Sequence, residues 1–181
     1  MSLFKIALVF LITTLFAACN SEQSLQEYYV DNQGDKEFVA VDVPTSLFAN
    51  SASLTPEQKT TLETVKKINI IAVPKKEENN LKIDEEKVKI SKILEDEQYQ
   101  LLMKFGGNAH KLEVYYTGNE EAVDEIIIYG FDEAKGVGIA RVLGDKMNPS
   151  DILQLVKSLD KGEIDMEGLS GITTMLTRSD M

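Results

Sequence analysis

The stretch that decides the fold is KLEVYYTGNEEAVDEIIIYGFDEAKGVGIARVL, residues 111–143. It contains three apolar segments, 111–117, 123–131 and 136–143, with short turns at 118–119 and 132–135 between them. In the first segment Leu112, Val114 and Tyr116 alternate with more polar residues, which is typical of a strand with one face in water. Strands joined by such short turns predict an antiparallel meander. We expect its middle strand, with three consecutive isoleucines at 126–128, to be the most buried.

Two strands and one helix are expected before the meander. Apolar segments at 37–43 and 68–73 each stop at a proline, Pro44 and Pro74, which has no N–H to give to a sheet. Between them Thr55 precedes Pro56, and Gln58 follows three residues after the threonine. This is the pattern of a helix N-cap with proline at the first helical position. The helix should continue to about Lys67.

Helices are also expected between 84 and 107 and after 148. Asp84 is the expected cap of a helical stretch that ends at Gly106 and Gly107, and a slip in its apolar spacing near Asp96 indicates two helices or a kinked one. The last helix begins with Asn148 as its cap and ends near Gly162. The side chains expected to point inward from the first stretch are those of Val88, Leu94, Leu101, Leu102 and Phe105.

This order of elements predicts a single α+β domain at 37–162. We expect a mixed sheet of about five strands, with the antiparallel meander at its C-terminal end and helices on one face. A ferredoxin-like relative is the nearest common shape. The remaining segment, 163–181, carries several apolar residues that would dock either on the domain or on a partner.

The first residues have the order of a secretory signal. Lys5 precedes an apolar run from Ile6 to Phe16, and Ala17 and Ala18 stand before Cys19. A membrane-spanning helix needs roughly 20 apolar residues, so we expect residues 1–18 to be a signal peptide that is removed. Residues 15–19 resemble the bacterial lipobox, which implies lipid on Cys19, the sole cysteine. The mostly polar residues 19–36 are expected to form a tether.

The charge of the chain excludes one class of partner. It has 19 basic and 30 acidic residues, a net charge of −11, and loss of Lys5 with the signal would make the balance one unit more negative. Nucleic-acid binding depends on Lys and Arg contacts to phosphates, so we expect no nucleic-acid partner. An acidic surface serves solubility, and it also suits cation binding or a basic partner.

Residues that carry catalysis are not arranged in any recognisable motif. His110 is the only histidine and lies between a glycine turn and a strand, where a surface histidine is common. The carboxylate runs lack the alternating layout of a calcium loop, and the pair Gly136 and Gly138 opens a strand rather than a helix. We therefore expect that the protein has no catalytic residue, binds no metal and no cofactor, and is not an enzyme. The paired carboxylates of a glycosidase would leave no linear motif and stay open as an alternative.

Two tyrosines are candidates for an interaction surface. Tyr115 and Tyr129 fall on the polar parity of the meander if its strands pair as expected. Exposed tyrosines on a sheet are common interface anchors, although tyrosine is also an ordinary strand residue.

The overall layout resembles that of a known class of proteins. A lipobox, a short tether, an extended segment at 38–44, a helix that leads into the strand 68–73, and Tyr99 to Met103 before a glycine turn are similar to the small domain-of-unknown-function lipoproteins of Bacteroidota. The resemblance covers most of the mature chain, and its motifs are apolar and structural, so it transfers no active site.

The expected function is that of a non-catalytic envelope protein that binds another protein. We expect lipid to hold the chain to a membrane, the outer one, with its periplasmic and surface faces both open. The alternatives are a small-ligand or divalent-cation binding module of the periplasm or cell surface, and a carboxylate-dependent hydrolase.

Overall fold

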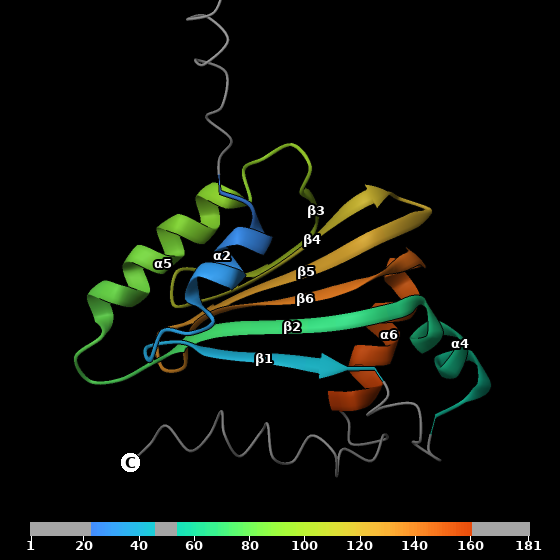
Figure 1. The fold of residues 1–181 in the computed structure, drawn as a ribbon, viewed down its shortest axis with the longest axis horizontal. Coiled ribbons are helices and arrows are strands. Elements are labelled where there is room, and N and C mark those ends of the chain that lie inside the picture. Colours follow the sequence, from blue (N-terminus) through green and yellow to red (C-terminus); the bar gives the residue numbers. More distant parts are fainter. Residues whose placement is uncertain (1–22, 46–53, 161–181) are drawn as a thin grey trace, which may run out of the picture.

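The computed structural model describes residues 23–45 and 54–160 (Figure 1). The expected signal peptide 1–18, Cys19 and the C-terminal segment 163–181 lie outside the described residues. The elements, in chain order, are α2 (Leu25–Asn32), β1 (Val39–Pro44), α4 (Pro56–Thr64), β2 (Val65–Pro74), α5 (Asn80–Ile93), β3 (Gln100–Gly106), β4 (His110–Asn119), β5 (Ala122–Asp132), β6 (Gly136–Met147) and α6 (Pro149–Asp160).

The strands form one six-stranded sheet in the order β1-β2-β6-β5-β4-β3. Every neighbouring pair is antiparallel. The α+β class and the antiparallel meander are confirmed, but the sheet is wholly antiparallel rather than mixed and has one strand more than the expected five. In a ferredoxin-like fold one strand lies between the two strands that each crossover helix joins, whereas β6, β5 and β4 lie between β2 and β3 here, so the strand order differs from that shape. The α5 segment instead connects β2 to β3 at the far edge of the sheet.

Helices cover both faces of the sheet, and the expectation of helices on one face is wrong. Ile127 of β5 is buried in one core cluster together with residues of α2 and α5. Its neighbour Ile126 is buried in a second cluster with Ile152 of α6. Adjacent residues of a strand point to opposite faces, so these two clusters lie on opposite sides. Figure 1 shows α5 and the pair α4 and α6 toward opposite ends of the sheet. A strand with three consecutive isoleucines is explained by burial on both sides.

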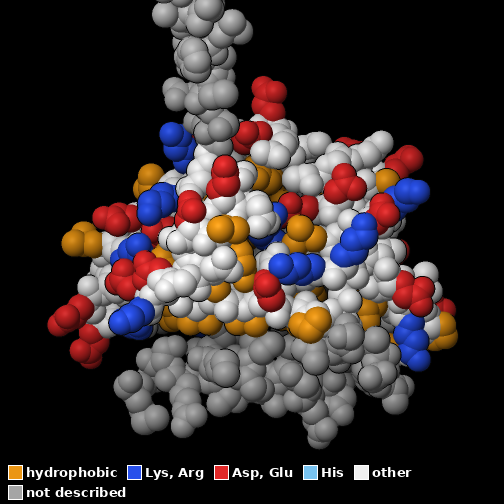
Figure 2. All heavy atoms as spheres, in the orientation of Figure 1, with side chains coloured by type: hydrophobic (Ala, Val, Ile, Leu, Met, Phe, Trp, Pro, Cys, Tyr) orange, Lys and Arg blue, Asp and Glu red, His pale blue; other side chains and the backbone are white. Residues whose placement is uncertain are grey.

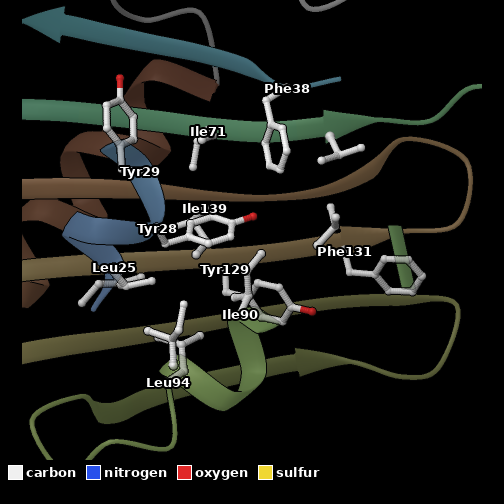
Figure 3. Packing of buried hydrophobic residues seen from close by; sticks show 14 of the residues in the cluster. Leu25, Tyr28, Tyr29, Phe38, Ile71, Ile90, Leu94, Tyr129, Phe131 and Ile139 are labelled. Atoms are coloured by element: carbon white, nitrogen blue, oxygen red, sulfur yellow. The ribbon is translucent and has the colours of Figure 1, made fainter. Parts of the chain in front are cut away.

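The helix α2 lies within the expected tether at 19–36 and corrects that expectation for residues 25–32. Leu25, Tyr28 and Tyr29 are buried in the core cluster beneath α2 and α5. Figure 3 shows Tyr28 beside Ile139 of the sheet, among residues contributed by α2, α5 and the strands. The helix begins with a capping box, because the Ser24 side chain accepts from the Glu27 N–H and the Glu27 side chain accepts from the Ser24 N–H. The domain therefore starts before residue 37.

The strand β3 lies where a helical stretch was expected. The helix α5 begins at Asn80, four residues before the expected cap Asp84, and ends at Ile93. Leu94 is buried as expected, but all four of the other residues expected to point inward are exposed, namely Val88, Leu101, Leu102 and Phe105. A bulge in β3, where the register shifts between Leu101 and Met103, breaks the period-two pattern that identifies a strand.

The helix starts at Pro56 and Pro149 are confirmed. The Thr55 side chain accepts from the Gln58 N–H at 3.3 Å, and the Gln58 side chain accepts from the Thr55 N–H at 2.9 Å. The Asn148 side chain accepts from the Ser150 N–H at 2.9 Å. The helix α4 ends at Thr64, three residues earlier than expected, because Val65 already pairs with Gly144 in the sheet.

Candidate functional site

The first candidate surface is the β3 edge, which we define as Leu101, Leu102, Met103 and Phe105. All seven residues of β3 are exposed, and the exposed fraction reaches 53% for Leu101 and 70% for Phe105. The strand stands at one end of the sheet, next to β4, and an edge strand leaves one row of backbone N–H and C=O groups without a strand partner. Lys104 is the one charged residue of β3.

The strand β3 presents apolar side chains to both faces of the sheet. Leu101 pairs with Tyr115, whose side chain lies on the α5 face, whereas Met103 pairs with Val114 on the opposite face. Phe105 pairs with Leu112, which is also exposed. Apolar side chains therefore surround the free backbone edge on both sides, which is the arrangement that an added β-strand contacts.

The second candidate surface is the open sheet face, which adjoins the β3 edge on the side of α6. Small residues form a row across three strands, because Ala72 pairs with Gly138 and Gly138 with Gly130. A Cβ at Gly138 would lie only 2.7 Å from the Cβ of Ala72, so this position has no room for a side chain. The result is a shallow apolar groove of about 460 Å³. We define the open sheet face by the residues Ile70, Ala72, Leu112, Ile128, Gly130, Gly138 and Ala140, all of which line this groove.

The third candidate is a lysine-lined cleft between α5 and the β3–β4 hairpin, with a volume of about 920 Å³. The aromatic rings of Tyr129 and Phe131 line it from the sheet. The Lys87 ammonium stands 3.9 Å from the centre of the Phe131 ring, which is a cation–π contact. Two carboxylates, Asp84 and Glu95, also line the cleft, and Asp84 lies 3.1 Å from the Lys87 ammonium. The lysines outnumber them, which suits an anionic ligand better than a cation. The four lysines of the cleft are Lys87, Lys92, Lys104 and Lys111.

A buried carboxylate organises one wall of this cleft. Glu113 is 5% exposed, and its Oε1 lies 3.1 Å from the Lys104 ammonium and 3.0 Å from the Lys111 ammonium. Burial by itself would raise the pKa of Glu113, but hydrogen bonds from Lys111, Lys104 and Tyr115 outweigh this effect and hold the pKa below its ordinary value. The carboxylate is therefore ionised at neutral pH, and two lysines against one glutamate leave a positive balance at this point.

Tyr115 and Tyr129, the expected interaction tyrosines, lie on the helix-covered face of the sheet. Tyr129 is 2% exposed and packs in the core under α5, so it is not a surface anchor (Figure 3). Tyr115 is half-buried, and its hydroxyl donates to Glu113 Oε2 at 3.0 Å. Burial, followed by this bond, raises the pKa of Tyr115 to about 12. The alternate positions of β4 that were expected to be polar do share one face of the sheet, but α5 and its lysines cover that face.

In the part of the chain that the structure describes, no group of side chains is arranged for metal binding or for catalysis by histidine. His110 is exposed at the start of β4, on the rim of the open sheet face. Within residues 23–45 and 54–160, no three histidine, cysteine, aspartate or glutamate side chains converge as metal ligands would. In the same residues, no helix is both long enough and apolar enough to cross a bilayer.

Sequence reasoning missed the β3 edge and α2. The signal for α2 was present, since Ser24 and Glu27 have the spacing of a capping box and Leu25, Tyr28 and Tyr29 share one side of a helix. The signal for β3 was weaker, because its bulge leaves apolar residues at successive positions and these also fit a helix.

The family model for a domain of unknown function, DUF4252, matches residues 28–155, which is more than half of the chain. The chain belongs to the DUF4252 family. The DUF4252 match begins inside α2 and ends inside α6, so it covers the six strands together with α4 and α5. No curated protein and no solved structure shows a significant match to the chain. The surfaces of this DUF4252 domain therefore carry the functional argument.

Proposed function

We propose that this protein is a non-catalytic, lipid-anchored envelope protein that binds another protein through the β3 edge. The observation that carries the proposal is the exposure of every residue of β3 at a free edge of the sheet. Proteins commonly protect such edges with charges, prolines or a covering element. Here Lys104 and the bulge at Leu101 to Met103 are modest protection for an edge that also exposes Phe105.

The proposed partner contributes an extended segment that pairs with β3. Backbone hydrogen bonds along the free edge would supply affinity, and the apolar side chains on both sides would supply specificity. Burying side chains such as Leu101 and Phe105 contributes about 1.5–3 kcal/mol each when they are fully covered. Two or three such anchors are the usual size of a binding hot spot.

The anchoring part of the proposal rests on the sequence. Residues 15–19 resemble a lipobox, and a Cys19 that carries two or more acyl chains would hold the domain durably at a membrane. We infer that the outer membrane is the anchoring membrane. The proposed partner is an envelope protein, because a tethered domain meets partners that share its compartment. Localisation of the chain and of its Cys19→Ser variant in membrane fractions tests this part separately.

The binding surface is tested by site-specific photo-crosslinking in the native cell. A photoreactive residue at 102 should capture one protein that the same residue at 81 does not, because Leu81 is 80% exposed at the start of α5, which follows β2, and three strands separate β2 from β3 in the sheet. Lysine substitution at Leu101 should abolish the crosslink from 102. Loss of the anchor by Cys19→Ser should remove the partner as well. Equal capture at 102 and 81, or capture that survives Leu101→Lys, would refute the edge as the binding surface.

A second candidate function is supported by the lysine-lined cleft. We propose as the alternative that this cleft binds a small anionic molecule of the periplasm or cell surface. The positive balance at Glu113 and the aromatic wall of Tyr129 and Phe131 favour an anion with an apolar part. A divalent cation would meet lysines at this position.

Ligand binding to the folded state raises thermal stability by mass action, so a thermal shift separates the two candidates. Millimolar inorganic phosphate and aromatic carboxylates should raise the Tm of the domain, and Lys104→Ala should remove the effect. The matched control Lys66→Ala, on an exposed lysine of β2, should leave it intact. An unchanged Tm with these anions, or a shift with calcium that Lys104→Ala does not alter, would end the case for this cleft.

A further inference from the structure

We propose that the partner of the β3 edge is a second copy of this chain, whose own β3 pairs with it in antiparallel fashion. This inference rests on the proposed function of the β3 edge and names its partner. The two six-stranded sheets would join into one continuous sheet about a two-fold axis, which is the symmetry of most homodimers.

The first step is the difference between the two outer strands of the described sheet. In β1 only Asp42 and Pro44 are exposed, and Pro44 has no N–H to give to a neighbouring strand. In β3 all seven residues are exposed, and the exposed fraction is highest for the apolar side chain of Phe105. A strand that pairs with β3 has to bring a free backbone edge and apolar side chains of its own. The β3 of a second copy supplies both.

The second step is the charge at one end of the edge. The two strands nearest the edge, β3 and β4, contain three residues that are charged at neutral pH, Lys104, Lys111 and Glu113. All three lie in the half of the hairpin next to its turn, where both lysines contact Glu113. Two lysines against one glutamate leave a positive balance at this end.

The third step is that the opposite end of the edge is acidic. Glu97 precedes β3, and Glu120 and Glu121 stand between β4 and β5, all three exposed. The Tyr116 hydroxyl lies 2.8 Å from Gln100 Oε1 and 3.4 Å from Glu120 Oε1, which places this turn beside the first residue of β3. An antiparallel pair puts the lysine end of each copy beside the acidic end of the other. A parallel pair would bring like charges together.

The fourth step is the register. Leu101 and Lys104 lie on the α5 face, because they pair with Tyr115 and Glu113, which share that face of β4. Residues that oppose one another across an antiparallel pair lie on the same face of the sheet. A two-fold axis at the centre of β3 that keeps this match places Leu101 of each copy opposite Lys104 of the other.

The fifth step is the strength of such a pair. Seven residues from each copy are fewer than the roughly 20–30 a side of a standard interface, so we expect a weak dimer that benefits from confinement at the proposed membrane. The net charge of −11 opposes association of two copies. Figure 2 shows, however, that Lys and Arg side chains are interspersed with Asp and Glu, and salt screens exposed charges beyond about 8 Å.

Photo-crosslinking identifies the partner. Two versions of the full chain with different epitope tags, each with a photoreactive residue in place of Leu102, are expressed together in the native cell. Conjugates that carry both tags and have twice the mass of one chain should form. A conjugate with a different protein would overturn this inference and leave the proposed function standing, whereas the absence of any conjugate would overturn both. A ladder of three or more copies would assign the partner edge to β1 and would overturn the two-fold pair.

Charge exchange tests the register. Leu101→Lys should lower the yield of the two-tag conjugate by about tenfold or more, because two lysine pairs would replace two contacts of an apolar side chain. Adding Lys104→Glu to the same chain should restore the yield, since each new lysine then faces a glutamate. The matched control, Leu101→Lys with Lys66→Glu on an exposed lysine of β2, should not restore it.

A further variant separates the loss of pairing from damage to the fold. Leu101→Glu keeps Lys104 and its contact with Glu113, adds a carboxylate opposite Lys104 of the other copy, and should retain most of the conjugate. Loss of the conjugate to the same extent in Leu101→Glu and Leu101→Lys would overturn the proposed pair. So would a Leu101→Lys, Lys104→Glu chain that keeps the wild-type Tm and gives no conjugate.

Discussion

Replacement of Glu86 should destabilise the fold more than replacement of any neighbouring glutamate of α5. Glu86 is 0% exposed, and its carboxylate accepts from the Tyr28 hydroxyl at 2.8 Å. The same carboxylate lies 2.8 Å from the Lys89 ammonium and 3.3 Å from that of Lys82. This cluster joins α2 to α5, so it also tests whether α2 belongs to the domain.

The magnitude follows from what each substitution leaves behind. In Glu86→Gln the amide oxygen still accepts from Tyr28, but hydrogen bonds to a charged group, about 1.5–3 kcal/mol each, become neutral ones of about 0.5–1.5 kcal/mol. Lys82 and Lys89 retain contact with water, which limits the loss. The free energy of unfolding should fall by about 2 kcal/mol. Glu86→Ala also leaves a cavity and an unpaired Tyr28 hydroxyl, and should cost about 3–5 kcal/mol.

The pH dependence of the effect has a definite sign. Burial alone would raise the pKa of Glu86, but hydrogen bonds from Lys89, Tyr28 and Lys82 outweigh it and hold the pKa below its ordinary value of 4.5. Because the folded pKa is below the unfolded one, the carboxylate stabilises the fold above about pH 4.5, and this contribution disappears as the pH falls through the folded pKa. The amide does not titrate. The difference between wild type and Glu86→Gln should therefore be full at pH 7 and shrink toward pH 3.

Urea unfolding at pH 7 and pH 3, followed by far-UV circular dichroism, measures these differences. Glu85→Gln is the matched control, because Glu85 is the exposed neighbour on the same helix and should change stability by less than about 0.5 kcal/mol. If Glu86→Gln and Glu85→Gln unfold at the same urea concentration, the buried cluster does not stabilise the domain and the argument is wrong.

Three further predictions concern α2, the groove and the covered tyrosine. Leu25→Ala should lower the free energy of unfolding, measured in urea, by about 2–4 kcal/mol. Val30→Ala, on the exposed side of α2, should change it by less than about 0.5 kcal/mol. Equal effects of the two variants would show that α2 is not packed as part of the domain. Gly138→Ala should cost about 1–3 kcal/mol because its Cβ meets β2, whereas Gly107→Ala, with open space around it, should be nearly neutral; a neutral Gly138→Ala would contradict the close approach of the strands. Tyr115 should ionise near pH 12 in an absorbance titration of the phenolates, where Tyr29 also ionises, so Tyr115→Phe should reduce the absorbance change of that step by the share of one tyrosine; an unchanged amplitude would show that the assignment is wrong.

The meander and two helix starts were predictable because their signals are local. Alternation in β4, the turns before β5 and β6, and the pairs Thr55–Pro56 and Asn148–Pro149 act through residues that are neighbours in the chain. The same local reasoning failed where a pattern fits two structures. The apolar residues of β3 suit a helix or a bulged strand, and its pairing with β4 decides the outcome.

The candidate surfaces were less predictable than the elements, because exposure depends on which elements cover which face. The alternation of side chains along β5 decides which face of the sheet Tyr129 points to. Tyr129 is a core residue because α5 crosses that face from β2 to β3. Phe105, in contrast, was expected to point inward and is one of the most exposed side chains at the edge.

The sequence by itself determined the α+β class, the acidic charge and the antiparallel meander. The tertiary structure decided the number of strands, the coverage of both sheet faces and the membership of α2 in the domain. The physical reason is the range of the interactions. Backbone conformation follows residues a few positions apart, whereas burial of Glu86 and Tyr129 and exposure of β3 follow from contacts between segments that are distant in the chain.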